Sequence, residues 1–392
     1  MHYKEYIQAT GINVLYLFAV YLFMPILAPY VKSLGLDAFQ IGLIFSLSPL
    51  FTIFSSSIMG KLSDEIGRMW VIIIGMILQI TAIIFYLIGN HWIFIAGARL
   101  FGAVAFVAVT LVAIAKIEDS LTNKERGKYA GWSFSIGHIG AIVAPIIGGL
   151  LVDKLFIKAP FILSAVILLA LSFMLVYRTP KLKVKPSKKS FNLYAGIKNF
   201  LAERPLKAMA ILGMVMHATT PAIQVFMPLL IIEKLGLTYS SIGLAMFFLG
   251  VTNLFQFFFG QLSDKFNRGT LILVGCGIYA FFMFFVSTTN TYWVLLILLL
   301  FQGVGGAIWN VSAWSLMSDI GEKTKKEGEI VGSYMSIAKI GSFISFIFSG
   351  LIVSIWGISS IFAVNAIIIA IGIIIASFYL DHKIYAHPQK IS

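Results

Sequence analysis

Charge is scarce in this chain of 392 residues, since Asp, Glu, Lys and Arg make up 11% of it and hydrophobic residues 59%. A soluble domain carries about 25% charged residues, so this chain cannot cover a surface that faces water. Its apolar residues come in runs of about 20, the length of a helix that crosses a hydrocarbon core. The alternating pattern of a membrane β-barrel is missing. The sequence therefore predicts an all-α polytopic membrane protein.

Cysteine is almost absent as well, because Cys276 is the single one and lies in an apolar run. This excludes disulfides and a cysteine-ligated metal site. The sequence also lacks an H-E-x-x-H motif, a Gly-rich phosphate loop before Lys-Ser/Thr, and a credible Ser/His/Asp set. We therefore expect no metal, no cofactor and no enzymatic activity.

Basic residues are in excess, with a formal net charge of +13. In a soluble protein this would suggest nucleic acid, but the loops of membrane proteins that face the cytoplasm are basic too. With the N-terminus inside, nearly all Lys and Arg fall on the inner side, and the outer side holds Lys32, Lys154, Lys158 and Lys234. We expect a plasma-membrane protein with both termini in the cytoplasm, a monomer, and no nucleic acid partner.

Run length and helix breakers predict twelve membrane spans. Their approximate ranges are 7–30, 38–60, 70–89, 92–115, 128–152, 159–177, 207–232, 239–260, 269–288, 292–316, 328–354 and 358–380. The stretch from Gly60 to Arg68 recurs as Gly260 to Arg268, and Asp119 recurs as Asp319. Parallel repeats of six spans are a common plan of secondary transporters, with substrate sites between the halves.

The repeat predicts three regions of the chain. Residues 1–180 form an N-terminal six-helix bundle, and residues 207–392 a C-terminal bundle with a short cytoplasmic tail. Residues 181–206 form a basic cytoplasmic linker, whose second part has apolar residues on one helical face and is expected to lie on the anionic inner leaflet.

Three stretches of sequence carry a family resemblance. The first is Gly60-x-Leu62-Ser63-Asp64-x-x-Gly67-Arg68, after the second span. The fifth span holds a glycine–proline pattern, and the first span a pair of prolines, Pro25 and Pro29. On these features the chain resembles the major facilitator superfamily, and within it the twelve-span drug:proton antiporter (multidrug efflux) families. The resemblance implies two pseudo-symmetric six-helix halves and transport by alternating access.

The first stretch and its repeat are predicted to form a gating loop in each half. Glycine allows a tight turn, and an aspartate can meet a helix N-terminus or an arginine. In the family this aspartate is held to bridge to the eleventh span and latch the inner side. The predicted gating residues are Gly60, Asp64, Gly67, Arg68, Arg126, Gly260, Asp264 and Arg268.

The pattern in the fifth span predicts a closely packed, kinked helix, because small residues admit neighbouring backbones and Pro145 removes a backbone bond. Packing alone would account for these residues, but the eleventh span lacks the proline. The resemblance implies that this face seals the route between the halves in one state. The predicted seal consists of Gly131, Gly140, Ala144, Pro145, Gly148 and Gly149.

Ionisable groups inside spans are costly and mark function by default. All 16 acids fall in loops or at span ends, so no embedded carboxylate can carry a proton. The resemblance implies that the first, fourth, seventh and tenth spans line a central cavity. The candidate substrate or proton residues are Asn13, Arg99, His138, His217, Gln224, Trp309, Asn310 and Lys339. A neutral histidine bonded to a carbonyl is an equally good account of either histidine.

The first hypothesis for function is a secondary transporter that exports hydrophobic or amphipathic small molecules, with proton antiport as one option. An alternative is a facilitator or importer of a small metabolite, an anion being one case, bound by Arg99 or Lys339. A second alternative is a membrane receptor that does not transport.

Overall fold

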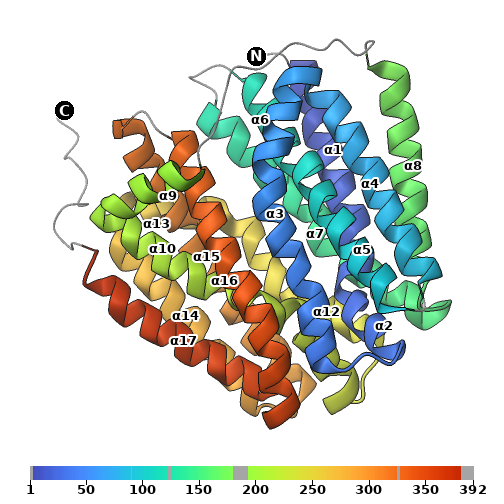
Figure 1. The fold of residues 1–392 in the computed structure, drawn as a ribbon. Helices are drawn as coiled ribbons and strands as arrows, with labels where there is room; N and C mark the ends of the chain where they lie inside the picture. The colour runs from blue at the N-terminus through green and yellow to red at the C-terminus, as the bar shows by residue number, and fades with distance from the viewer. Residues whose placement is uncertain (1–2, 90, 122–125, 180–192, 325–326, 381–392) are drawn as a thin grey trace. The chain divides into compact units, whose positions relative to one another are not determined.

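The computed structural model describes residues 3–89, 91–121, 126–179, 193–324 and 327–380 (Figure 1). Within these ranges twelve helical segments are long and apolar enough to cross a membrane, and no strand occurs. The predicted all-α, twelve-span fold is confirmed. Helices are what a lipid environment demands, since a span has no water to satisfy its backbone N–H and C=O groups.

Regular helix is interrupted twice in the first six spans, by η1 and by η2. The elements of these spans are α1 (Tyr3–Phe23), η1 (Met24–Ile26) and α2 (Leu27–Ser33); α3 (Ala38–Ile66); α4 (Arg68–Ile88); α5 (Trp92–Phe106), η2 (Val107–Leu111) and α6 (Val112–Asp119); α7 (Arg126–Lys154); and α8 (Ala159–Arg178). Asp37 begins α3 with a capping box, in which its Oδ1 accepts from the Gln40 N–H at 2.8 Å.

The second six spans follow a short helix, α9 (Leu193–Ala202), in the predicted linker. Their elements are α10 (Arg204–His217), η3 (Ala222–Phe226), α11 (Met227–Leu229) and η4 (Leu230–Lys234); α12 (Tyr239–Gly250), η5 (Val251–Phe255) and α13 (Gln256–Lys265); α14 (Arg268–Thr288); α15 (Tyr292–Thr324); α16 (Glu327–Trp356); and α17 (Ser360–Ser377). The helix predicted after Ser190 is thus present, while residues 181–192 of the linker lie outside the described ones.

Contacts divide the chain into two compact units, which we describe separately. Unit 1 comprises Met1–Ser190 and Met227–Phe247, and unit 2 comprises Phe191–Phe226 and Phe248–Ser392. The end of the seventh span and the start of the eighth therefore pack with the first-half helices. The predicted division of the chain at residues 181–206 remains a prediction.

The core of unit 1 lies where α1 packs against α7 and α8, and α4 against α5. Phe23 and Phe161 stack at its centre with ring centroids 4.9 Å apart. Beside them the Tyr30 hydroxyl donates to the Tyr86 carbonyl at 2.6 Å. This bond satisfies a polar group that would otherwise be buried without a partner.

The core of unit 2 lies where α14 packs against α15 and α17, and α10 against α16 and α17. Gly275 on α14 and Gly305 on α15 each approach the backbone of the other helix so closely that a Cβ would overlap with it. The short helix α9 rests on α16 and α10, where the Asn199 side chain donates to Glu329 Oε1 at 2.7 Å.

One detail of the predicted gating loops is wrong. Gly60 and Gly260 do not turn the chain, because both lie inside helices, α3 and α13. The turn is made at Gly67 alone, which has φ +93° and ψ 147°, and at the extended Phe266 in the repeat. The helices run on because Lys61 to Ile66 carry no helix breaker before that glycine.

Candidate functional site

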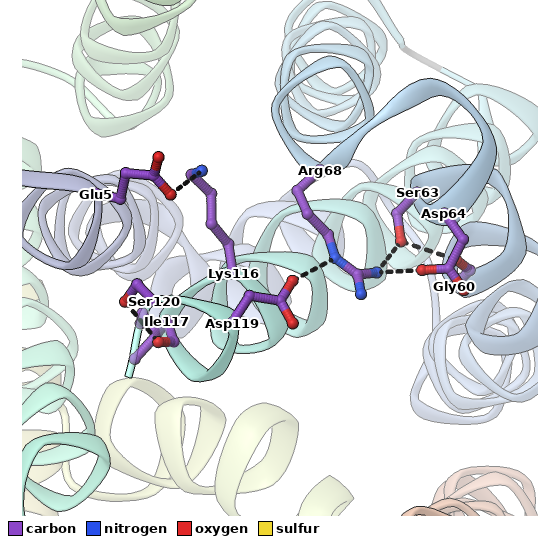
Figure 2. A network of polar contacts seen from close by, with 9 residues as sticks. All are labelled: Glu5, Gly60, Ser63, Asp64, Arg68, Lys116, Ile117, Asp119 and Ser120. Atoms are coloured by element: carbon purple, nitrogen blue, oxygen red, sulfur yellow. Dashed lines mark hydrogen bonds and ion pairs between the residues drawn. The ribbon is translucent and has the colours of Figure 1, made fainter. Parts of the chain in front are cut away.

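Arg68 is the centre of a charged cluster in unit 1, which we call the first arginine cluster (Figure 2). Its Nη1 lies 3.0 Å from Asp64 Oδ1 and also donates to the Ser63 hydroxyl. Its Nε donates to Asp119 Oδ2 at 3.2 Å. The guanidinium therefore joins the end of α3, the start of α4 and the end of α6.

The local sequence explains how these groups meet. Asp64 and Arg68 are four residues apart and flank Gly67, whose positive φ reverses the chain so that α4 can begin at Arg68. Asp119 is the last residue of α6. Helix ends thus supply all three charges, and the planar guanidinium offers enough N–H donors for both carboxylates.

The duplicated stretch forms a second arginine cluster in unit 2. Arg268 Nη2 lies 3.6 Å from Asp264 Oδ1, and Nη1 pairs with Asp319. Nη1 also donates to the Ser315 carbonyl at 2.6 Å. The partners Asp119 and Asp319 were absent from the predicted gating residues, although the sequence repeat contains both.

The arginine clusters can hold neighbouring helices together reversibly. Apart from Asp319, which lies in the last two turns of α15, their charges lie at helix ends. Part of each side chain is exposed, and exposed ion pairs are worth about 0.2–1 kcal/mol. Such contacts can break and re-form without unfolding a helix. The neighbouring Glu65 takes no part in them, since it lies 3.8 Å from Lys61. The side chain of Arg126, predicted to belong to the gate, lies outside the described ones.

The predicted seal lies on α7. A Cβ on Gly140 would overlap with the Val14 carbonyl, and one on Gly148 with the Leu22 carbonyl, so α1 packs directly on this face. Ala144 on the same helix is fully buried. The surroundings of Gly131 lie outside the described residues. Small residues here permit backbone contact between helices, as predicted from the sequence.

The proline end of α7 meets α12 inside unit 1. A Cβ on Gly149 would overlap with the Tyr239 carbonyl, and one on Gly243 with the Pro145 carbonyl. Pro145 and Gly149 therefore face the first turns of the eighth span. This face is where α7 contacts a segment of the second half of the sequence.

Two polar contacts, which the sequence did not reveal, strengthen this end of unit 1. Asp153 caps α12, accepting from the Tyr239 N–H at 3.0 Å and the Ser240 N–H at 2.8 Å. Lys32 and Glu233 form an ion pair at 2.6 Å. The carboxylate at the N-terminus of α12 is favoured by the helix dipole as well as by its hydrogen bonds.

A cavity of about 310 Å³ lies inside unit 2. It brings together three of the predicted substrate residues, His217, Trp309 and Asn310, from α10 and α15. The residues that line it beyond these three are Met216, Thr220, Ile223, Leu249, Asn253, Tyr279, Gly303 and Gly306. Tyr279 and the aliphatic side chains were missed by the prediction, because nothing in their local sequence separates them from ordinary packing residues.

Two walls of this cavity are interruptions of helices. The helix α10 ends at His217, and Pro221 lacks the N–H that would bond the His217 carbonyl. Hydroxyl groups replace it, since Thr220 Oγ1 donates to that carbonyl at 2.6 Å and Ser342 Oγ at 3.0 Å. The second interruption is η5, whose Asn253 lines the cavity. Irregular backbone at membrane depth is tolerated where it lines a cavity.

The remaining substrate candidates lie outside this cavity. Arg99 on α5 is buried, with its guanidinium carbon 4.3 Å from the Phe45 ring centroid and Nη1 3.8 Å from Met24 Sδ. Asn13 is buried beside Gly137, and His138 is half-buried on α7. In unit 2, Gln224 is half-buried in η3, and Lys339 is half-buried on α16, which packs against α10.

The sequence model of the family described as Major Facilitator Superfamily matches residues 9–253 and 209–391. The chain belongs to this superfamily. An uncharacterized MFS-type transporter from Methanocaldococcus jannaschii is 30% identical over 363 residues, 89% of this chain and 92% of that protein. The quinolone resistance protein NorA from Staphylococcus aureus is 21% identical over 375 residues, 94% of this chain and 95% of that protein.

The chain is also similar in fold to solved structures of transporters. The crystal structure of a point mutant of the nucleoside transporter NupG matches 96% of this chain and 100% of its own, with a TM-score of 0.80 and 13% sequence identity. Family and fold together make this chain a multi-pass membrane transporter of the major facilitator superfamily, whose members bind small-molecule substrates.

Proposed function

We propose that this transporter exports hydrophobic or amphipathic small molecules by alternating access. The observation that carries the proposal is the occurrence of the arginine cluster twice, on Arg68 and on Arg268, at equivalent places of the repeat. A cycle that opens and closes one side of the protein needs contacts that break at low cost, and partly exposed ion pairs at helix ends meet that need.

The face of α7 acts as the seal on the other side of the cycle. Its glycines admit the backbones of α1 and α12, and Asp153 ties α12 in place. Backbone contact of this kind excludes water, and the Asp153 and Lys32–Glu233 contacts must part before a solute can leave by that route.

Export of amphipathic compounds is supported by the cavity in unit 2 and by the relatives. The cavity combines the indole of Trp309 and the aliphatic chains of Ile223 and Leu249 with the amides of Asn253 and Asn310. Such a mixture suits a poorly hydrated solute with a few polar groups. NorA, similar over nearly the whole chain, is described as a resistance protein.

The proposed setting is the plasma membrane, with both termini in the cytoplasm and the arginine clusters on the inner side. The distribution of Lys and Arg supports this orientation. The linker helix α9 then lies near the anionic inner leaflet. The transporter works as a monomer. Proton exchange would depend on His138 or His217, since no carboxylate lies within the predicted spans.

Transport in oriented membrane vesicles tests the proposal. Inverted vesicles from cells that express the chain should accumulate amphipathic test compounds, and right-side-out vesicles should not. An imposed pH gradient should raise the accumulation if protons are exchanged. The matched control is Glu65→Gln, which removes an acid beside the first arginine cluster and should leave accumulation unchanged. Accumulation in right-side-out vesicles only would replace export by import, and none in either would favour a receptor.

Import of a small anionic metabolite is the second candidate, and Arg99 favours it. Its guanidinium is buried against Phe45 and Met24, and among the described residues it makes no ion pair. A permanent charge at such a place is costly unless a ligand offsets it. The right-side-out vesicles of the same experiment test this candidate.

A further inference from the structure

Lys339 is a cation inside a span that has no acidic partner among the described residues. It is half-buried on α16, and the nearest described acid on that helix, Glu329, stands ten residues earlier, about 15 Å along the axis. Glu329 is itself engaged with Asn199. A lysine at membrane depth is expensive without a counter-charge, so its presence there calls for a function.

The surroundings of Lys339 connect it to the cavity of unit 2. Lys339 lies on α16, which packs against α10, and α10 ends at the cavity residue His217. Ser342, one turn further on the same face of α16, donates to the His217 carbonyl at 3.0 Å and lies 3.2 Å from the Thr220 hydroxyl. The face of α16 that carries Lys339 is therefore held against the interrupted part of the seventh span.

The cavity supplies the apolar contact surface that a lone lysine cannot offer to the rest of a ligand. Its lining of Trp309, Ile223 and Leu249 fits an apolar or aromatic body, and its size of about 310 Å³ lies at the small end of ligand sites. The His217 ring is oriented by a backbone carbonyl of the same helix, since its Nδ1 lies 3.0 Å from the carbonyl oxygen of Gly213, one turn earlier. No carboxylate lines the cavity to repel an acid.

We propose that Lys339 and this cavity form a subsite for organic acids with an aromatic body, the acid group binding beside Lys339 and the body lying against Trp309. The ammonium donates charge-assisted hydrogen bonds to a carboxylate, and the carboxylate supplies the missing counter-charge. This substrate class rests on the proposed transport function, but binding at the subsite can be measured without transport.

The test compares three solutes that share one ring system and differ in charge: 2-naphthoate, 2-naphthamide and 2-naphthylmethylammonium. Their binding to the purified full-length chain in detergent is measured by calorimetry, with gluconate as the buffer anion. The subsite predicts that 2-naphthoate binds about tenfold more tightly than 2-naphthamide, the gain of one charge-assisted contact. The ammonium compound should bind most weakly. Equal affinities for the acid and the amide would overturn the proposal.

Variants assign the preference to Lys339. Lys339→Gln should make the affinities for the acid and the amide equal, while Lys339→Arg, which keeps the charge, should retain most of the preference. Lys198→Gln removes the same charge from the exposed surface of α9 and should change neither affinity. If Lys339→Gln still preferred 2-naphthoate to 2-naphthamide, another group would bind the carboxylate and the proposal would be wrong. The series of solutes on the unmodified chain decides the matter if a variant fails to fold.

Two further measurements separate the organic-acid subsite from a general anion site and from the proposed transport function. Replacing gluconate by chloride should weaken 2-naphthoate binding only slightly, because chloride cannot fill the apolar part of the site. Complete displacement by chloride would overturn the assignment to organic acids. Vesicle transport of 2-naphthoate is measured separately: binding without transport leaves the subsite standing and contradicts the proposed export, whereas transport without Lys339-dependent binding contradicts the subsite alone.

Discussion

The two arginine clusters have the same residues at the same spacing but hold their arginines differently. In the first, Arg68 is 26% exposed, lies 3.0 Å from Asp64 and donates to Asp119 at 3.2 Å. In the second, Arg268 is 14% exposed, lies 3.6 Å from Asp264, and binds α15 through both Asp319 and the Ser315 carbonyl. Arg68 is thus shared between two carboxylates, whereas Arg268 makes its shorter contacts with α15.

The turns that precede the two arginines differ as well. Gly67 has a backbone conformation that only glycine adopts readily, and Asn267 instead begins α14 as an N-cap, its Oδ1 accepting from the Thr270 N–H at 3.1 Å. A capped helix start with a less exposed arginine is expected to be stiffer than a glycine turn whose arginine is shared between two carboxylates. The difference predicts that the contacts of Arg68 break more readily than those of Arg268, which makes the Arg68 contact the mobile one of the two.

The largest effect is expected from the more deeply held arginine. Arg268→Ala removes its bonds to Asp319 and to the Ser315 carbonyl, and vesicle transport should fall at least about tenfold, with roughly 1–2 kcal/mol lost in thermal stability. Arg68→Ala should reduce transport as well but cost less stability, because among the described residues Arg68 binds side chains and no backbone carbonyl. Transport assays and thermal unfolding in detergent measure both. Equal losses of stability would contradict the asymmetry.

Exchanging the two turn residues comes next in size. Gly67→Asn places a side chain at φ +93°, and should cost about 1–3 kcal/mol of stability. Asn267→Gly keeps the helix start with a weaker cap and should cost only a few tenths of a kcal/mol. Thermal unfolding of the two variants side by side checks the ratio. Similar shifts would mean that the chain can turn at residue 67 without glycine.

The smallest effect is expected for Asp64 and Asp264, the aspartates four residues before the two arginines. Asp64 is 28% exposed and Asp264 69% exposed, so only the former is firmly engaged with its arginine. Asp64→Asn should lower vesicle transport roughly threefold, and Asp264→Asn by less than about twofold, in line with the small worth of exposed pairs. Glu65→Gln serves as the neighbouring control. A greater loss with Asp264→Asn would reverse the assignment of the mobile contact.

Much of the fold could be predicted from residue order alone. The length of apolar runs determines spans because the thickness of a bilayer is fixed, and all twelve are present. The repeat located Arg68 and Arg268 at equivalent places, and the glycines of α7 indicated backbone packing. The error at Gly60 and Gly260 arose because a polar stretch was taken for loop, whereas a helix can continue past the membrane core into water.

The candidate site was predicted only in part. His217, Trp309 and Asn310 were foreseen because polar and aromatic residues are unusual in spans, and they line one cavity. Tyr279 could not be distinguished, since an aromatic residue in an apolar helix is usually packing. Asp153 looked like any acid at a span end until α12 was seen to begin against its carboxylate.

By itself the sequence determined the membrane class, the number of spans and their duplication, including the repeated aspartates and arginines, because these depend on local length, spacing and composition. Only the tertiary structure decided which partner each charge takes. Asp119 reaches Arg68 across 51 positions, and Asp153 caps a helix that begins 86 positions later. Contacts of this kind depend on how helices pack, and packing follows from the shapes of whole faces rather than from any short stretch of residues.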